Sequence, residues 1–320
     1  MPLRKVLIIR FSSIGDIVLT TPIIRCVRKQ VGAEVHVLTK NEYTSLLEHN
    51  PYIDRILTLQ PKLSKTALDV RQEKYDLIID LHKSLRSRLI TAFSGSASIR
   101  YNKLNFSKWL MVRFKINRLP IGKHLVDRYF EALNTLGIFD DGMGLDFFIK
   151  PEDADVAKQK VTGFPYQVLI LGATYYTKRI PFNKCEEIIS STTMQTVLLG
   201  GKDVNEIAKA LAIKHPQKVL NFCGTLNIGT SAAILTDAKK VYSGDTGMMH
   251  MAAALQKELV VLWGSTIPEF GMFPYYGKQN VPTFTNLEVK GLACRPCSKL
   301  GFNACPEKHF NCMNGIHIPS

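Results

Sequence analysis

Apolar and polar residues alternate along the first half of the chain in blocks of strand length and helix length. Lys5 to Arg10 is a short β-branched run, and after a turn at Ser12 to Asp16 apolar residues recur at helical spacing as far as Val31. The further strand-sized segments are Glu34–Leu38, Arg55–Leu59, Leu77–Asp80 and Ser98–Tyr101, with helical stretches beginning near Asn41, Lys65 and Ser84. Strands and helices that alternate at this length predict a parallel sheet covered on both faces.

The pattern lapses between Phe139 and Pro151, where acidic residues and glycines have the composition of a hinge. It then restarts with strand-sized segments at Val168–Leu171, Thr196–Leu199, Lys218–Asn221, Lys240–Tyr242 and Leu259–Trp263. We therefore predict an α/β protein with two doubly wound, Rossmann-like parallel-sheet domains, residues 1–150 and 151–320. Ligands of such sheets bind at the carboxyl ends of the strands, so the expected site is a cleft that the two domains face.

The composition of the chain limits the kinds of partner and the cellular compartment that we expect. The 320 residues carry 41 Lys and Arg against 27 Asp and Glu, a formal charge of +14, which favours a polyanionic partner. No apolar stretch is long enough to span a bilayer, and Arg10 interrupts the first apolar run too early for a secretory signal. Cys26, Cys185 and Cys223 lie singly in apolar segments, as reduced core thiols do. We expect a cytoplasmic protein.

The turn after the first strand carries the first candidate chemistry. Gly15 can adopt backbone angles closed to other residues, and Ser13 and Asp16 can cap the following helix. The turn is either only a helix start or the site of a general base. In the second case, partial burial in a cleft would raise the pKa of Asp16 toward the range useful for a base.

Two more loops follow strands. Gly244 to His250 joins a strand to an apolar helical segment, and a helix start of this kind favours a phosphate group. The alternative is that Asp245 is only the N-cap and His250 a buried core residue. Gly172 to Arg179 carries two adjacent cations and hydroxyl side chains, which suit a diphosphate or simply a solvated loop. Neither standard nucleotide fingerprint is present.

Charge is concentrated between Leu81 and Phe130, where eleven cations and one acid, Asp127, give a net +10. Aromatic residues lie among them, so the segment fits either an amphipathic surface for anionic lipid or a cradle for an acidic acceptor. The positive charge fits nucleic acid equally well, but no recognised nucleic-acid module accompanies the segment.

A separate cluster of four cysteines could hold structural zinc, remain as free thiols or form a labile disulfide. Its members are Cys294, Cys297, Cys305 and Cys312.

The ordered set of motifs resembles the bacterial lipopolysaccharide heptosyltransferases, glycosyltransferase family 9, over nearly the full length. The matching pieces are Arg10–Pro22, Asp80–His82 with Arg86 and Ser87, His124–Tyr129, Lys178 before Pro181, Gly244–Gly247 with His250, and Gly264–Thr266. The resemblance implies a GT-B fold, with the acceptor mainly on the N-terminal domain and the nucleotide sugar mainly on the C-terminal one. It also implies an inverting reaction that needs no metal and no other cofactor.

The resemblance also implies roles for particular residues. Asp16 would be the general base, Lys178 would contact the phosphates, and the segment holding Asp245 and His250 would bind the nucleotide sugar. The full set of substrate-binding candidates is Ser13, Gly15, Thr174, Thr177, Asp203, Leu226, Asp245, Thr246, Gly247 and His250. Two features depart from the family pattern: the loop Thr174 to Lys178 is a residue shorter, and the chain stops seven residues after Met313. Asp203 is a candidate match to the acid that often contacts the ribose in the family.

The sequence therefore predicts an enzyme that moves a heptose or similar sugar from an ADP-linked donor to a lipopolysaccharide core or lipid A type acceptor. We expect it to lie at the periphery of the inner membrane, with the basic segment toward the anionic leaflet, and not to bind nucleic acid. One alternative is a GT-B transferase or epimerase that uses a UDP-linked sugar. Another is a non-enzymatic, basic membrane or nucleic-acid binding protein.

Overall fold

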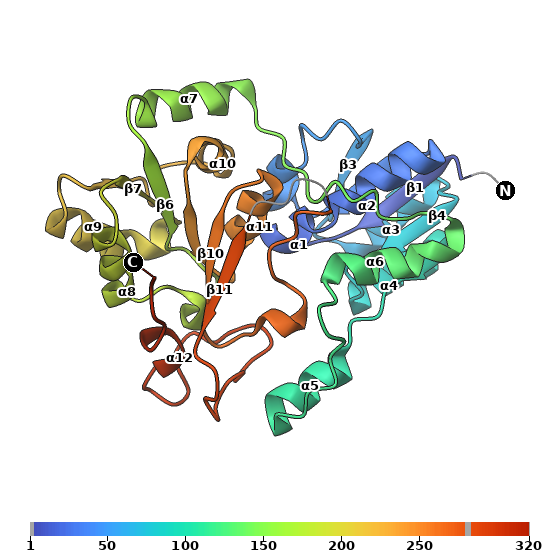
Figure 1. Ribbon diagram of the computed structural model, residues 1–320. Helices are drawn as coiled ribbons and strands as arrows, with labels where there is room; N and C mark the ends of the chain where they lie inside the picture. Colours follow the sequence, from blue (N-terminus) through green and yellow to red (C-terminus); the bar gives the residue numbers. More distant parts are fainter. Residues whose placement is uncertain (1–2, 279–282, 320) are drawn as a thin grey trace. The chain divides into compact units, whose positions relative to one another are not determined.

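The computed structural model describes residues 3–278 and 283–319 (Figure 1). Contacts within the chain divide it into two compact units. Unit 1 holds the described residues of 1–103, 124–148 and 277–279, and unit 2 those of 104–123, 149–276 and 280–320. Residues 104–123 therefore pack with the second unit although they lie in the first half of the sequence. The assignment of 1–150 to the acceptor and 151–320 to the nucleotide sugar stays a prediction.

Unit 1 is built on a five-stranded parallel sheet of order β3-β2-β1-β4-β5. Its strands are β1 (Lys5–Ile9), β2 (Glu34–Thr39), β3 (Arg55–Thr58), β4 (Leu77–Asp80) and β5 (Ala97–Arg100). Successive residues from Val6 to Ile9 are fully buried, so both faces of β1 are covered, as the apolar run predicts. The chain passes from β1 outward to β2 and β3, then returns to β4 on the other side of β1. The strand order thus reverses between β1 and β4.

The helices of unit 1 are α1 (Ile14–Val18), α2 (Thr21–Cys26), α3 (Leu63–Gln72), α4 (Leu85–Ser94) and α6 (Leu125–Leu133), with short turns η1 (Val27–Val31), η2 (Asn41–Leu46) and η3 (Asn134–Leu136). The predicted helical stretch between residues 14 and 31 is therefore divided. Pro22 has no N–H to continue the bonding of α1. The hydroxyls of Thr20 and Thr21 instead donate to the carbonyls of Ile17 and Val18, at 2.7 and 2.8 Å. A new helix can then start at Thr21.

Unit 2 is built on a six-stranded parallel sheet of order β11-β10-β9-β6-β7-β8. Its strands are β6 (Tyr166–Ile170), β7 (Gln195–Leu199), β8 (Val219–Asn221), β9 (Val241–Gly244), β10 (Leu259–Trp263) and β11 (Phe284–Glu288). The predicted α/β fold with two parallel sheets is confirmed. Strand β11 was not predicted, because its mixed sequence FTNLE is only partly buried at the edge of the sheet. The strand order reverses between β6 and β9.

Unit 2 has seven helices and three short 3₁₀ turns among its described residues. They are α5 (Asn105–Phe114), α7 (Pro151–Val161), α8 (Phe182–Ser190), α9 (Asn205–Lys214), α10 (Ile228–Asp237), α11 (Gly247–Ala254) and α12 (Asn311–Asn314), with turns η4 (Tyr176–Lys178), η5 (Lys202–Val204) and η6 (Pro268–Phe270). Figure 1 shows α7 against α10 and α8 beside α9. Apolar residues of α8, α9, β7 and the chain end, including Met313 and Ile316, form one core cluster with the sheet. This core holds the ends of β6 and β9 in place.

Candidate functional site

The carboxyl ends of β1 and β4 carry the first group of candidate residues. Ligands of open parallel sheets bind where the strand order reverses, and that point lies here in unit 1. Arg10 follows β1 directly, and its Nη2 lies 2.5 Å from Oδ1 of Asp16 in α1. The other carboxylate oxygen of Asp16 accepts from the backbone N–H and the hydroxyl of Ser13, at 3.2 and 3.0 Å. Ser13, Gly15 and Asp16 thus share one short turn that Arg10 closes.

Arg10 is anchored on several sides. Its Nε donates to the carbonyl of Ser12 at 2.9 Å, and its Nη1 donates to the carbonyl of Leu81 at 2.5 Å. The same nitrogen lies 3.5 Å from the hydroxyl of Tyr129 on α6. Only 9% of the Arg10 side chain is exposed, against 23% of the Asp16 side chain. The carboxylate therefore keeps an open side while the guanidinium is fixed.

The predicted rise in the pKa of Asp16 is wrong. Burial does push this pKa upward, but the charge of Arg10, together with hydrogen bonds from Ser13 and Arg10, outweighs burial and leaves the pKa below its ordinary value of 3.8. The prediction took into account the burial of Asp16 but not the positive charge of Arg10 beside it. Asp16 is therefore an ionised acceptor of protons throughout the neutral range.

We expect Arg10→Gln to lower the free energy of unfolding by about 3 kcal/mol at pH 7, because removing one partner of a buried pair leaves the other charge uncompensated. The sign of the pH dependence follows from the lowered pKa of Asp16. The pair stabilises the fold above the ordinary value of 3.8 and loses this effect as the pH falls through the lower, folded-state pKa. The difference between parent and variant, measured by urea denaturation, should shrink at the acid end.

The control is Arg71→Gln, which removes an exposed arginine of α3. We expect it to leave the unfolding free energy within about 0.5 kcal/mol of the parent. Equal stability of Arg10→Gln and the parent at pH 7 would show that the ion pair contributes nothing.

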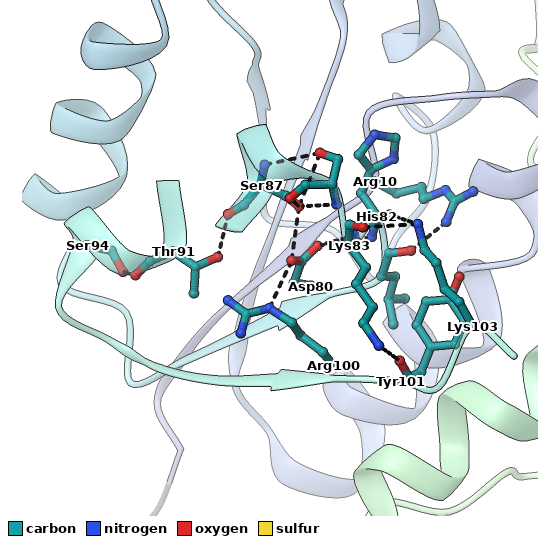
Figure 2. Close-up of polar contacts among 12 residues, drawn as sticks. Arg10, Asp80, His82, Lys83, Ser87, Thr91, Ser94, Arg100, Tyr101 and Lys103 are labelled. Atoms are coloured by element: carbon teal, nitrogen blue, oxygen red, sulfur yellow. Dashed lines mark hydrogen bonds and ion pairs between the residues drawn. The ribbon is translucent and has the colours of Figure 1, made fainter. Parts of the chain in front are cut away.

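His82 lies beside this pair, after β4. Its ring centroid is 4.6 Å from that of Phe11, and its Nδ1 is buried without a hydrogen-bond partner among the described residues. Burial, followed by the charges of Arg10 and Lys103, lowers the pKa of His82 to about 4, so the ring is neutral at pH 7. Figure 2 shows Arg10, His82 and Lys103 gathered at this end of the sheet. A neutral imidazole there can exchange a hydrogen bond with a bound hydroxyl.

Asp80, the last residue of β4, holds the loop that carries His82. It is fully buried and accepts from the backbone N–H groups of His82 and Lys83, at 3.1 and 2.7 Å. Its other oxygen accepts from the Ser87 hydroxyl at 3.0 Å and from Nε of Arg100 at 3.2 Å (Figure 2). These four hydrogen bonds fix the loop after β4, in which the carbonyl of Leu81 accepts a hydrogen bond from Arg10.

Arg10, Asp80 and His82 received no predicted role, although the family motifs contain all three. The signal that could have found them is a charged or polar residue directly at the end of a buried strand. Such a residue is placed at the ligand-binding edge of a parallel sheet whatever the strand order.

The carboxyl ends of β6 and β9 carry the second group of candidates, in unit 2. Lys178, in the loop after β6, lies with its Nζ 2.6 Å from Oδ2 of Asp245, directly after β9. The same oxygen accepts from the hydroxyl of Thr266, after β10, at 2.8 Å. The side chains of Lys178 and Asp245 are 16% and 10% exposed. The structure thus brings together two predicted site residues at the point where the strand order reverses.

Glycines allow the loop with Lys178 to lie directly on the strand ends. A Cβ on Gly244 would stand 2.2 Å from the Lys178 carbonyl oxygen, and one on Gly264 would stand 2.6 Å from that of Thr177. Both distances are shorter than any real contact of a side chain with backbone. The close approach that places the Lys178 side chain beside Asp245 therefore needs glycine at both positions.

Thr177 and Thr174 take different positions in that loop. The Thr177 hydroxyl accepts hydrogen bonds from the hydroxyl of Ser265 at 2.9 Å and from the N–H of Phe302 at 2.8 Å. Thr177 is buried. Thr177 therefore braces the loop from inside, while Thr174 is exposed to solvent. Their predicted roles in substrate binding stay predictions.

Helix α11 begins beside Asp245. Thr246, and not Asp245, is the N-cap: its hydroxyl accepts from the N–H of Met249 at 3.4 Å. The alternative interpretation of Asp245 as the cap is wrong, because its carboxylate is turned to Lys178 and Thr266. Gly247 is the first helical residue, and His250 is buried one turn further on. A cation and the start of an eight-residue helix thus occupy one end of this sheet.

The remaining candidates lie in the loops after β7 and β8. Asp203 forms an ion pair with Arg179, whose Nε also donates to the carbonyl of Ala173 at 3.1 Å. Leu226 is half-buried in the segment between β8 and α10. Asp203 and Leu226 belong to the same carboxyl edge of the sheet as Lys178, and their predicted roles in substrate binding stay predictions.

The four clustered cysteines are reduced. Within residues 3–278 and 283–319 no group of three His, Cys, Asp or Glu side chains is placed to hold a metal ion. Cys294 Sγ lies 4.0 Å from Nε2 of His309, and burial raises the pKa of Cys312 to about 11. All four are free thiols in the structure, and the zinc and labile-disulfide interpretations stay predictions. In the same described residues, no helix is both long and apolar enough to cross a bilayer.

Comparison with known proteins identifies the family. The model of glycosyltransferase family 9 (heptosyltransferase) matches residues 64–297. Among curated relatives, lipooligosaccharide heptosyltransferase 2 of Haemophilus ducreyi is 27% identical over 300 residues, which cover 83% of this chain and 85% of the relative.

Two solved structures share the fold. The family 9 glycosyltransferase of Veillonella parvula has a TM-score of 0.73 at 20% identity and covers 89% of this chain and 88% of its own. The Escherichia coli ADP-heptose lps heptosyltransferase II has a TM-score of 0.69 at 19% identity and covers 97% and 98%. The family match spans well over half of the 320 residues, from α3 to Cys297. The chain therefore belongs to glycosyltransferase family 9.

Proposed function

We propose that this glycosyltransferase moves a heptose from an ADP-linked donor to an acceptor of the lipopolysaccharide core or lipid A type, with inversion and without a metal ion. The observation that carries the proposal is the Lys178 ammonium at the start of α11, held by Asp245 at the reversal of strand order. A fixed cation and the N–H groups of a helix start together suit a diphosphate. The names of two relatives, an ADP-heptose lps heptosyltransferase and a lipooligosaccharide heptosyltransferase, support the sugar, the nucleotide and the acceptor.

The first step assigned to the protein is proton removal. The ionised Asp16 carboxylate accepts the proton of the acceptor hydroxyl as that oxygen attacks the anomeric carbon of the donor. The bond between the anomeric carbon and the diphosphate oxygen breaks, and its electron pair leaves with ADP. Attack from the face opposite the leaving group inverts the configuration at carbon. Because the pKa of Asp16 is lowered, Asp16 is always ready to accept, although it is a weak base.

The second contribution is stabilisation of the leaving group. Negative charge grows on the diphosphate as the bond breaks, and Lys178 with the first N–H groups of α11 can hold that charge without reorganisation. Asp245 orients the ammonium. These protein groups supply the charge stabilisation for which other transferases use a divalent cation.

The acceptor and the membrane complete the proposal. Cations at the end of β4 and β5, among them Lys83, Arg100 and Lys103, favour a phosphorylated acceptor in unit 1. Such an acceptor is an amphiphile, so we propose that the enzyme works at the periphery of the inner membrane, on the anionic cytoplasmic leaflet.

The test is a transfer assay with ADP-heptose and a heptose-free core acceptor in excess EDTA. We expect product whose new glycosidic bond has the configuration opposite to that of the donor, read by NMR. In a parallel thermal-shift measurement, ADP at roughly 100 times its Kd stabilises the protein by about 2.7 kcal/mol, and UDP at the same concentration does not. Stabilisation by UDP alone, or transfer that EDTA abolishes, would refute the donor or the metal-free mechanism respectively.

A further inference from the structure

Helix α5 and the segment after it form a basic surface in unit 2. Residues 104–123 contain five cations, Lys108, Arg113, Lys115, Arg118 and Lys123, and no acidic residue. No residue of α5 is buried, unlike the other helices of ten residues. A helix without a fully buried side chain leaves much of its surface available for contact with another surface.

That face is aromatic. Phe106, Trp109 and Phe114 are 67%, 51% and 53% exposed, and their rings contact one another. The ring centroids of Phe106 and Trp109 are 5.9 Å apart in a stacked arrangement, and those of Trp109 and Phe114 are 5.3 Å apart, edge to face. Ile116 and Ile121 continue the exposed apolar residues, at 47% and 101%. Single exposed apolar residues are ordinary, but a contiguous group indicates an interaction surface.

The opposite side of the segment is tied to unit 2. Met111 and Val112 pack against Ile267 and Phe270 near the end of β10. Lys115 Nζ donates to the carbonyls of Cys294 and Pro296, at 3.3 and 2.6 Å. The segment is thus anchored through one side, and the three aromatic rings are presented to solvent by a defined structure.

We propose that α5 docks unit 2 on an anionic phospholipid surface, with Phe106, Trp109 and Phe114 entering the interfacial region and the neighbouring cations meeting the lipid phosphates. Aromatic side chains favour the boundary between headgroups and acyl chains, and Lys and Arg stems can extend along apolar surface toward phosphate. The charge argues against a second copy of the chain as occupant, since five cations without an acid would repel their own image. The inference deepens the membrane location that the proposed function includes.

Trp109 makes the test direct. The chain has two tryptophans, and the other, Trp263, is fully buried. A change in emission on adding vesicles therefore reports the surroundings of Trp109. We expect a blue shift with vesicles of phosphatidylglycerol mixed into phosphatidylcholine, at least tenfold weaker binding to pure phosphatidylcholine, and loss of the anionic preference in high salt. Trp109→Phe, which keeps an aromatic ring, should bind in co-sedimentation yet show no blue shift.

The variant Phe106→Ser with Phe114→Ser should bind the anionic vesicles at least tenfold less tightly than the parent. Ile213→Ser, which removes an 81%-exposed apolar side chain from α9, is the matched control and should bind as the parent does. Transfer to a delipidated, soluble acceptor should be unchanged in the double variant. If the parent binds vesicles but transfers no heptose, the proposed function fails and the docking surface stands.

Three results would overturn the docking surface. One is the absence of a blue shift with anionic vesicles. Another is a blue shift that depends on protein concentration without vesicles, which would mean self-association. The third is loss of transfer to the soluble acceptor in the double variant, which would place α5 in acceptor binding.

Discussion

Asp16→Asn lowers the rate of sugar transfer by about 10²–10⁴-fold, the range expected when a general base is lost. Asparagine has nearly the shape of aspartate, and its one amide oxygen can still accept from Arg10, while its NH2 group takes the place of the oxygen that accepts from Ser13. The amide cannot take a proton from the acceptor hydroxyl. The measurement is kcat with saturating ADP-heptose, together with the thermal shift caused by ADP, which we expect to be unchanged.

The lowered pKa adds a pH dependence to this prediction. Since Asp16 is ionised well below neutrality in the parent, the parent rate should show no acid limb from this group between pH 7 and about pH 5. Asp155→Asn, the same chemical change at an exposed site of α7, is the control and should transfer at the parental rate. Parental turnover in Asp16→Asn would remove Asp16 from the mechanism, whatever its place in the fold.

Lys178→Met should weaken ADP binding by about 10–100-fold, because a charge-assisted contact to phosphate is worth roughly 1.5–3 kcal/mol. Transfer should fall further than binding, since the ammonium faces more charge as the diphosphate leaves. ADP affinity is measured by calorimetry and transfer at saturating donor. Lys209→Met removes an equal charge from an exposed side chain of α9, where it pairs with exposed Glu206, and should leave both values unchanged.

Loss of Lys178 also leaves the Asp245 carboxylate without this cation and with the hydroxyl of Thr266 beside it, so lower stability would contribute to any defect. The double variant Lys178→Met with Asp245→Asn separates the effects. It removes both charges, so we expect it to recover stability relative to Lys178→Met but not to recover ADP affinity. Recovery of ADP affinity in the double variant would mean that Lys178 serves only to neutralise Asp245.

The central strands were predictable because they are buried on both faces. Strands β4 and β10 were predicted to the residue, since Leu77–Asp80 and Leu259–Trp263 are short apolar runs with clear ends. The edge strand β11 is only partly buried and has a mixed sequence, and it was missed. The break between α1 and α2 is set by Pro22 and two threonine hydroxyls, which change backbone bonding but not the spacing of apolar residues.

The site was predictable as a set of loops but not as a set of contacts. Asp16, Lys178 and Asp245 stand out because each follows a strand. Their partners depend on which strands are neighbours, and the order in each sheet cannot be read from the chain. The wrong direction for the pKa of Asp16 has this cause, because Arg10 is six residues away and only the folded turn brings its guanidinium to the carboxylate. The cleft predicted between the two domains stays a prediction.

The contact of the Lys178 carbonyl with the bare Cα of Gly244 has a consequence for how such an enzyme can diverge. Close packing of main chain against main chain sets the distance between the loop and the sheet. Side chains at the tip of the loop, such as Thr174, can therefore be replaced without moving the Lys178 ammonium away from the strand ends. Gly244→Ala, which adds one methyl group, would push the loop away from the sheet. If Lys178 binds the diphosphate as we propose, substitutions along the loop can change the donor preference while the ammonium keeps its position.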